Sequence, residues 1–207
     1  MICNYRALTL LIYLVVFCLL SHAQVPSYVP SSGLVAYYTL NGNLNDVSGS
    51  GNNGVAYGAV GYGADRFGAA LSCYKGNGAG EGDIPVNNFP TGNASRTISV
   101  FYKYKLPYAG GGRAFFGWGN NIFAGRFNLF ASDTYVGGEY VNGVVRVASY
   151  TVDSCWHNLT ATYPTSGSGS SSVKLYLDGY LVASSVILPT STYNTPSGPW
   201  HGLGGNI

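Results

Sequence analysis

The sequence predicts an all-β protein in which two antiparallel sheets pack face to face. Three observations support this prediction: few charged residues, many turn-forming residues, and short segments in which apolar residues recur at every second position. Charged residues make up 9% of the chain, whereas glycine occurs 30 times and tyrosine 18 times. This composition disfavours long amphipathic helices, which need a charged face, and suits short strands joined by tight turns.

Residues 1–23 have the layout of a secretory signal peptide, which we expect to form a helix ahead of the folded domain. Arg6 precedes an apolar run at residues 7–20, and Ser21-His22-Ala23 places small residues at both key positions of a cleavage site. An uncleaved signal anchor is the alternative, but the run is shorter than the ~20 residues of a membrane span. The mature chain opens with a Pro/Ser leader at residues 24–32, and we expect it to be secreted, with no membrane insertion.

The strand prediction is clearest at residues 96–104, which read RTISVFYKY. Apolar Ile98, Val100 and Tyr102 fall on one face of an extended chain, and the intervening residues fall on the other. Residues 156–163 alternate in the same way, and residues 173–183 hold two strands around Asp178-Gly179, the strongest short hairpin signal in the chain. Further short strands are expected at residues 34–40, 55–60, 69–74, 83–86, 114–118, 127–131, 134–140 and 144–150.

Four segments carry a family resemblance when they are taken in chain order. They are GLVAYYTLNGNLNDVSGSGNNG at residues 33–54, RFGAALSCYKG at 66–76, RTISVFYKY at 96–104, and the pair CWHNLTATY and VKLYLDGYLVAS within 155–184. In this order they resemble the laminin-G-like jelly-roll domains of the concanavalin A-like superfamily. The resemblance implies a two-sheet antiparallel jelly roll over residues 33–207, with Phe101 near the position where a core tryptophan is common. Domains of this family are expected to end with an acidic closing strand. We expect this domain to lack that strand.

The turn-rich loop at residues 41–54 is the candidate calcium site. Asp46 supplies a carboxylate, while Asn43, Asn52 and Asn53 supply neutral amide oxygens, and calcium in proteins prefers such oxygen ligands. The family resemblance also implies a structural calcium in this loop, with a further acidic ligand from the closing strand. The alternative is a plain turn-rich loop, because a single carboxylate makes a weak site.

Cys73 and Cys155 are the two cysteines that remain after the signal peptide is removed. Thiols oxidise outside the cell, so the simplest prediction is one disulfide between them. The alternative is that both are unpaired small hydrophobic residues inside the sandwich.

Two sequons, at Asn93 and Asn158, are candidate N-glycosylation sites in a secreted chain. Asn93 lies in a predicted loop. Asn158 lies in a predicted strand, on the face opposite Leu159 and Ala161, so its side chain is expected to point to solvent. An unused sequon is the alternative, more so at Asn158.

Aromatic residues in or beside predicted loops are candidate ligand-binding residues. An aromatic face can stack on the C–H side of a sugar ring, while Asn and Asp bind its hydroxyls. Packing in the core or along a strand edge is the alternative for each of them. Trp118 and Trp156 lie within predicted strands and are assigned to the core. The candidates are Tyr108, Phe123, Tyr135, Tyr140 and Trp200.

Catalysis finds little support in the sequence. Glycosidases on related sandwiches place two carboxylates on one strand face, and the nearest approach here is Glu81 with Asp83. His157 lies beside Trp156 in a predicted strand, where we expect it to satisfy a hydrogen bond rather than act as a base. A net charge of +2 without a basic cluster gives no indication of nucleic-acid binding.

The sequence therefore predicts a secreted, non-catalytic recognition module that binds a glycan or an extracellular protein, assisted by calcium. One alternative is a secreted polysaccharide hydrolase of the concanavalin A-like superfamily, which requires paired carboxylates in a cleft. The other alternative is a non-functional domain fragment.

Overall fold

The computed structural model describes residues 25–76, 80–104, 113–120, 125–132, 134–140, 143–148, 150–151, 153–165, 169–182, 184–187, 192–197 and 200–203. The predicted signal peptide lies outside these ranges. Within them, no helix has the length and apolar character needed to cross a membrane.

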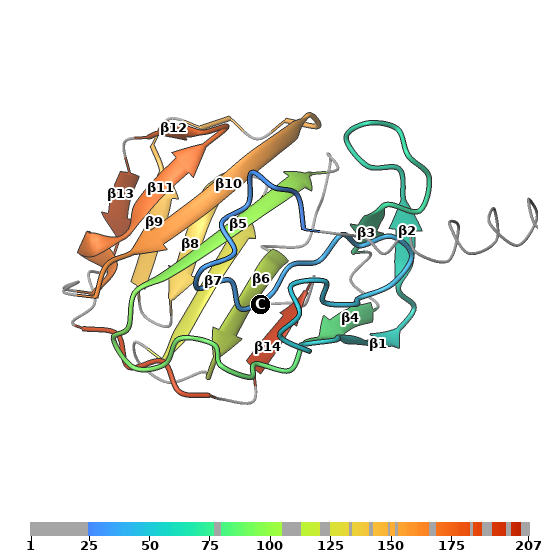
Figure 1. Ribbon diagram of the computed structural model, residues 1–207. Coiled ribbons are helices and arrows are strands. Elements are labelled where there is room, and N and C mark those ends of the chain that lie inside the picture. Colours follow the sequence, from blue (N-terminus) through green and yellow to red (C-terminus); the bar gives the residue numbers. More distant parts are fainter. Residues whose placement is uncertain are drawn as a thin grey trace, which may run out of the picture.

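The described residues form an antiparallel β-sandwich, which confirms the predicted fold class (Figure 1). The larger sheet has eight strands in the order β1-β4-β14-β6-β7-β8-β9-β13, the smaller has four in the order β12-β11-β10-β5, and β2 pairs with β3 in a separate hairpin. A short 3₁₀ helix, η1, spans Gly169–Ser172. In chain order the strands are β1 (Val55–Gly58), β2 (Gly61–Gly63), β3 (Cys73–Lys75), β4 (Gly80–Asp83), β5 (Arg96–Lys103), β6 (Arg113–Gly119), β7 (Arg126–Ala131), β8 (Val136–Tyr140), β9 (Gly143–Val147), β10 (Trp156–Tyr163), β11 (Lys174–Leu177), β12 (Tyr180–Leu181), β13 (Ser184–Ile187) and β14 (Trp200–Leu203).

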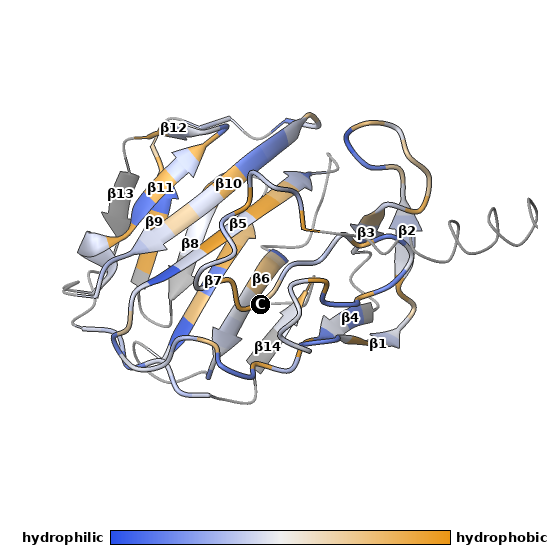
Figure 2. Cartoon of the chain, viewed as in Figure 1, coloured by the Kyte–Doolittle hydropathy of each residue, from blue (hydrophilic) through white to orange (hydrophobic). Residues whose placement is uncertain are grey.

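The smaller sheet follows the two-residue period closely. Ile98 and Tyr102 of β5 are buried and Val100 packs partly buried beside them, whereas Ser99 and Phe101, on the other face of the strand, are exposed (Figure 2). The hairpin between β11 and β12 turns at Asp178 and Gly179, with φ of 51° and 85°. Two successive positive φ values are typical of the two-residue hairpin turn that an Asp-Gly pair favours.

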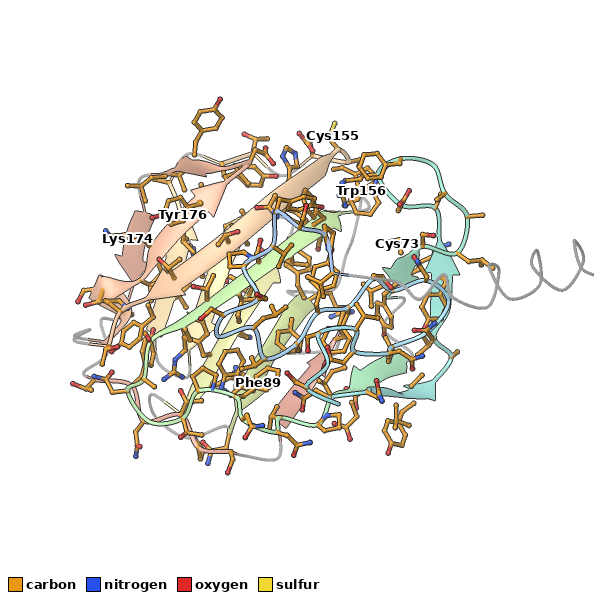
Figure 3. All side chains as sticks on the ribbon, in the orientation of Figure 1. Cys73, Phe89, Cys155, Trp156, Lys174 and Tyr176 are labelled. Carbon is orange, nitrogen blue, oxygen red and sulfur yellow. The ribbon has the colours of Figure 1, made fainter. Side chains whose placement is uncertain are left out.

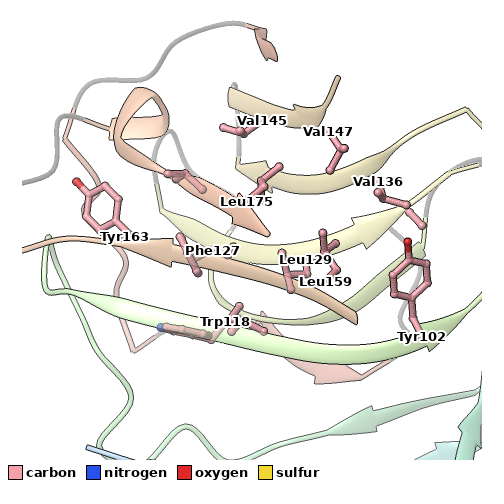
Figure 4. Packing of buried hydrophobic residues seen from close by; sticks show 14 of the residues in the cluster. Tyr102, Trp118, Phe127, Leu129, Val136, Val145, Val147, Leu159, Tyr163 and Leu175 are labelled. Carbon is pink, nitrogen blue, oxygen red and sulfur yellow. The ribbon is translucent and has the colours of Figure 1, made fainter. Parts of the chain in front are cut away.

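The core lies between the two sheets. Leu159, Ala161 and Leu175, from β10 and β11, are fully buried, as the sequence predicted, and they share one cluster with Phe127 and Leu129 of β7 (Figure 4). Burying one such large apolar side chain contributes roughly 1.5–3 kcal/mol. The rest of the fold positions surface residues around this core.

The N-terminal segment at residues 34–54 is an irregular layer rather than the predicted strand. Its only ladder contact among the described residues is the isolated bridge between Tyr38 and Asp46. Leu40 adopts φ of 57°, which ends any extended run, and the Tyr37 N–H is bonded to a side chain instead of a neighbouring strand. Leu44 then packs with two residues from β14 and the segment after β4 in a second, smaller cluster.

The short strands β2, β13 and β14 and the glycine-containing start of β4 were not predicted from the sequence. Residues 80–82, ahead of the strand predicted at 83–86, belong to β4, where a Cβ on Gly82 would lie 2.7 Å from Leu44 Cδ1. Close packing therefore requires glycine at this position. Because glycine has no side chain, this stretch shows no alternation of apolar residues from which a strand could be predicted. Near the end of the chain, β14 lies between β4 and β6 in the larger sheet.

Candidate functional site

The predicted calcium loop is organised around the Asp46 carboxylate. Asp46 Oδ1 accepts hydrogen bonds from the backbone N–H groups of Tyr37 and Ser48, both at 2.9 Å, and Oδ2 accepts one from Asn52 at 3.0 Å. Burial alone would raise the pKa of Asp46, but these donors outweigh it and hold that pKa below its ordinary value. The charge of Asp46 is therefore already compensated by backbone dipoles.

The predicted amide ligands are also engaged. Asn52 is fully buried, and its Nδ2 donates to the carbonyls of Val35 and Asn87 at 2.8 and 3.2 Å, while its Oδ1 accepts the Asn87 N–H at 2.9 Å. Asn53 Oδ1 accepts the Asp46 N–H at 2.9 Å. These amides tie the loop to its neighbours.

The four predicted ligands do not fit a calcium site. The remaining one, Asn43, uses Oδ1 to accept the Asn45 N–H at 2.9 Å, so every predicted amide oxygen faces a backbone donor. Calcium needs about six to eight converging oxygens. The part of the chain that the structure describes also contains no group of three His, Cys, Asp or Glu residues suited to a metal. Hydrogen bonds to its own side chains hold the loop in place, and glycines with positive φ form its turns.

The outward face of the smaller sheet presents a mixed aromatic and polar surface, which we call the outer patch. Three cross-strand pairs of β5 and β10 form it: Lys103 with Trp156, Phe101 with Asn158, and Ser99 with Thr160. Phe101 is 49% exposed, so its expected place in the core is wrong: it lies on the solvent side of the two-residue alternation. Trp156, also assigned to the core, is partly exposed (Figure 3).

A hydrogen-bond network links the polar members of the outer patch. Asn158 Nδ2 donates to Ser99 Oγ at 3.1 Å and to the Val100 carbonyl at 3.3 Å. Thr160 Oγ1 donates to Ser99 Oγ at 2.7 Å. Thr160 Oγ1 also lies 3.1 Å from Asn158 Oδ1, so the three side chains form one closed network in which each holds the other two in place.

His157 joins two carboxylates at the end of the smaller sheet. Its Nδ1 lies 2.8 Å from Asp178 Oδ2 and its Nε2 lies 3.0 Å from Asp153 Oδ1. Burial lowers the pKa of His157, but the two carboxylates outweigh it and raise that pKa above 6.5. Both ring nitrogens are engaged, as expected of a histidine that satisfies hydrogen bonds rather than one that acts as a base.

The two carboxylate partners of His157 were not predicted from the sequence. Asp178 is 21 residues away from His157 and belongs to the β11–β12 turn. Its Oδ1 also accepts the Asn158 N–H at 2.8 Å. The pairing of Leu159 with Leu177 fixes this approach. A register assigned from the two alternating segments would have revealed it.

The predicted ligand-binding aromatics do not form one described site. Tyr135 packs edge-on against Phe130 at 4.9 Å between ring centroids, and Arg146 Cζ covers its ring at 3.6 Å. Trp118 is buried, as predicted, and donates to the Pro90 carbonyl. Tyr108 and Phe123 lie outside the described residues, as do the side chains of Tyr140 and Trp200, whose backbones belong to β8 and β14.

The predicted disulfide is absent: Cys73 and Cys155 are both free thiols (Figure 3). Cys73 belongs to the separate β2–β3 hairpin, where its Sγ contacts the Tyr74 carbonyl at 3.3 Å. Cys155 is exposed in the turn into β10, where its N–H donates to Asp153 Oδ1 at 2.7 Å. Cys73 is therefore positioned by β3 and Cys155 by the turn into β10, and these two strands belong to different sheets. Burial, reinforced by Asp65, raises the pKa of the Cys73 thiol.

The chain is similar in structure to botulinum neurotoxin binding domains. The binding domain of serotype D/C aligns with a TM-score of 0.50 and 15% identity over 81% of this chain and 42% of that one. The binding domain of neurotoxin DC in complex with rat synaptotagmin II gives 0.48 and 15% over 79% and 42%. A structure from work on type C neurotoxin cell entry through two ganglioside molecules gives 0.47 and 15% over 79% and 41%. The likeness to the serotype D/C domain shows a shared fold. The chain spans less than half the length of each of these structures.

Comparison by sequence gives no family assignment: no protein-family model and no curated protein matches the chain. The laminin-G-like resemblance therefore stays a prediction.

Proposed function

We propose that this chain is a secreted, non-catalytic recognition module that binds a glycan through the outer patch. The observation that supports this proposal best is the combination of exposed aromatic rings with an amide and hydroxyl network on one sheet face. Phe101 and Trp156 offer apolar faces, and Ser99, Asn158 and Thr160 lie beside them. Sugars present the matching chemistry, a C–H face and a rim of hydroxyls.

The outer patch is preorganised, which favours binding. The Asn158 and Thr160 side chains are held by Ser99, so a ligand need not immobilise three free rotamers. Ordering a side chain on binding costs ~0.5–1.5 kcal/mol, and a prebuilt network avoids most of that cost. The eight paired positions of β5 and β10 also give a rigid base for weak contacts.

The hydrolase alternative needs two carboxylates about 5–9.5 Å apart. Cross-strand pairing places Asp83, Gly202, Gly117, Asn128 and Glu139 in one row of the larger sheet. Four strand spacings of ~4.8 Å put the backbones of Asp83 and Glu139 ~19 Å apart. Glu81 and Asp83 lie two residues apart on one face of β4, close enough for such a pair, but Glu81 is exposed beside edge strand β1 instead of enclosed in a cleft.

A glycan array probed with the secreted protein tests the proposal, using a matched pair of aromatic truncations. Phe101→Ala removes a ring from the outer patch and should weaken binding about tenfold, the loss of one stacking contact. Tyr180→Ala removes a ring that is 78% exposed on β12 of the same sheet and should leave binding unchanged. No glycan binding by the folded wild-type protein, or equal effects of both truncations, would contradict the proposal.

A further inference from the structure

Arg66 of the β2–β3 connection reaches across to the outer patch. Its guanidinium carbon lies 3.9 Å from the ring centroid of Phe101 and 4.3 Å from that of Phe67. Phe67 is 78% exposed, so the planar cation is held beside two rings at the surface. Cation–π contacts of this kind fix the orientation of a guanidinium without using its N–H groups.

The connection that carries Arg66 is itself fixed. Asp65 Oδ1 accepts the backbone N–H groups of Phe67 and Ala69, both at 2.9 Å, which closes a tight turn. The Asp65 carboxylate is thereby directed to its own backbone. Among the described residues, Arg66 has no hydrogen-bond or ion-pair partner, so its donors face solvent.

The other charges around the outer patch favour an anion. Lys103 lies two residues beyond Phe101 on the same strand face and adds a second cation. The carboxylates at this end of the sheet, Asp153 and Asp178, are both bonded to His157. Within the described part of the chain, Arg66 and Lys103 therefore form no ion pair beside a surface whose two aspartates are bonded to His157.

We infer that the ligand of the outer patch is a glycan that carries a carboxylate, with Arg66 as the residue that binds the carboxylate. This inference rests on the proposed function and specifies the class of sugar. A guanidinium presents two parallel N–H donors that match a carboxylate in a bidentate geometry. The sugar ring then lies over the polar network of Ser99, Asn158 and Thr160, beside the stacked Arg66 and Phe101, while Lys103 adds longer-range attraction.

Three matched trisaccharide or disaccharide probes test this inference by calorimetry or surface plasmon resonance: lactose, 3′-sialyllactose and 3′-sulfolactose. A hyaluronan hexasaccharide adds a second source of carboxylate, a uronic acid. We expect at least one carboxylated probe to bind at least about tenfold more tightly than both lactose and the sulfated probe. A tenfold difference in affinity is the size expected from one charge-assisted hydrogen bond. Arg66→Gln should abolish this preference, and Arg66→Lys should restore it only in part, because lysine lacks the planar fork.

Lys174→Gln is the matched control, since it removes a cation from the same sheet at its far end, opposite Thr162. It should preserve the preference, and thermal unfolding checks that every variant is folded. Equal binding of lactose and the carboxylated probes overturns this inference and leaves the proposed function standing. Equal binding of the sulfated probe, or a preference that survives Arg66→Gln, also overturns it. Absence of binding to every sugar removes both the inference and the proposed function.

Discussion

The backbone N–H of Tyr37 donates to Asp46 Oδ1 at 2.9 Å, although nine residues separate the two. Ser48 and Asn52 donate to the same carboxylate, so one side chain satisfies three backbone donors of an irregular loop. Buried backbone groups outside regular structure need such partners. The Asp46 carboxylate thus provides from within the chain the order that a bound cation provides in other turn-rich loops.

Replacing Asp46 with alanine should lower the free energy of unfolding by about 2–3 kcal/mol, because backbone donors lose a charged acceptor. Because the pKa of Asp46 is lowered in the folded state, its contribution should be present above pH ~4 and fade as the pH falls. Urea unfolding at pH 7 and pH 3 measures both effects. Asp65→Ala is the control, because it removes another aspartate whose carboxylate accepts backbone N–H groups in a turn. Calcium should leave the wild-type melting temperature unchanged, and a rise of several degrees would contradict this account.

The His157 cluster predicts a pH-dependent stability of the opposite sign. The raised pKa of His157 means that its contribution is complete below pH 6.5 and is lost as the pH rises through the folded-state pKa. Tyr102, Tyr150 and the two aspartates face the ring, and no cation among the described residues contacts it. His157→Gln should lower the melting temperature by about 2–4 °C at pH 5.5, a surface-pair effect, and by less at pH 9.

Lys174→Gln is the control for this pH series, because it removes a positive charge from the same sheet. Its melting temperature should run parallel to that of the wild type between pH 5.5 and pH 9. A His157→Gln difference that grows with pH would show that the neutral imidazole, rather than the imidazolium, stabilises the fold.

Gly117 in β6 should not tolerate a side chain. A Cβ there would lie 2.3 Å from Asn128 Cβ and 2.7 Å from Asn128 Cα, and backbone atoms of a paired strand cannot move aside. Gly117→Ala should cost about 1–3 kcal/mol of stability or more. Gly63→Ala, where nothing lies within 4 Å, is the control and should change stability little. Equal stability of both variants in denaturant titrations would contradict the close pairing of β6 with β7 at Gly117 and Asn128.

The two sequons should differ in occupancy. Asn158 Nδ2 donates to Ser99 and to the Val100 carbonyl within the sheet, and a glycan on that nitrogen would remove a donor and cover the outer patch. Asn93 lies outside any strand, between Phe89 and β5. We expect a glycan at Asn93 and none at Asn158 in protein secreted from eukaryotic cells. Peptide mapping by mass spectrometry after enzymatic deglycosylation measures both sites, and high occupancy at Asn158 would contradict binding through this face.

The bounds of the alternating strands β5 and β10 could be predicted to within one residue, whereas the glycine-containing start of β4 and the whole of β14 were missed. Strand β10 spans the residues predicted for it, because apolar residues at every second position bury one face in any sandwich. The β4 and β14 strands are short and glycine-containing, so they carry too few side chains to show a period.

The candidate site was harder to predict, because it depends on contacts between distant segments. Arg66 meets Phe101 only through the placement of the β2–β3 connection, 35 residues earlier in the chain. Likewise, Asp46 was recognised as an oxygen ligand, but local sequence does not distinguish a carboxylate that binds backbone N–H groups from one that binds a metal. Tertiary placement decides both.

The most direct test of recognition through the outer patch is a nuclear magnetic resonance titration of the isotope-labelled protein with the tightest-binding glycan. Binding at the outer patch should shift the amide signals of six residues as the glycan concentration rises: Ser99, Phe101, Lys103, Asn158, Thr160 and Arg66. Shifts confined to β6, β7, β8 and β9 of the larger sheet, with β5 and β10 unchanged, would contradict it.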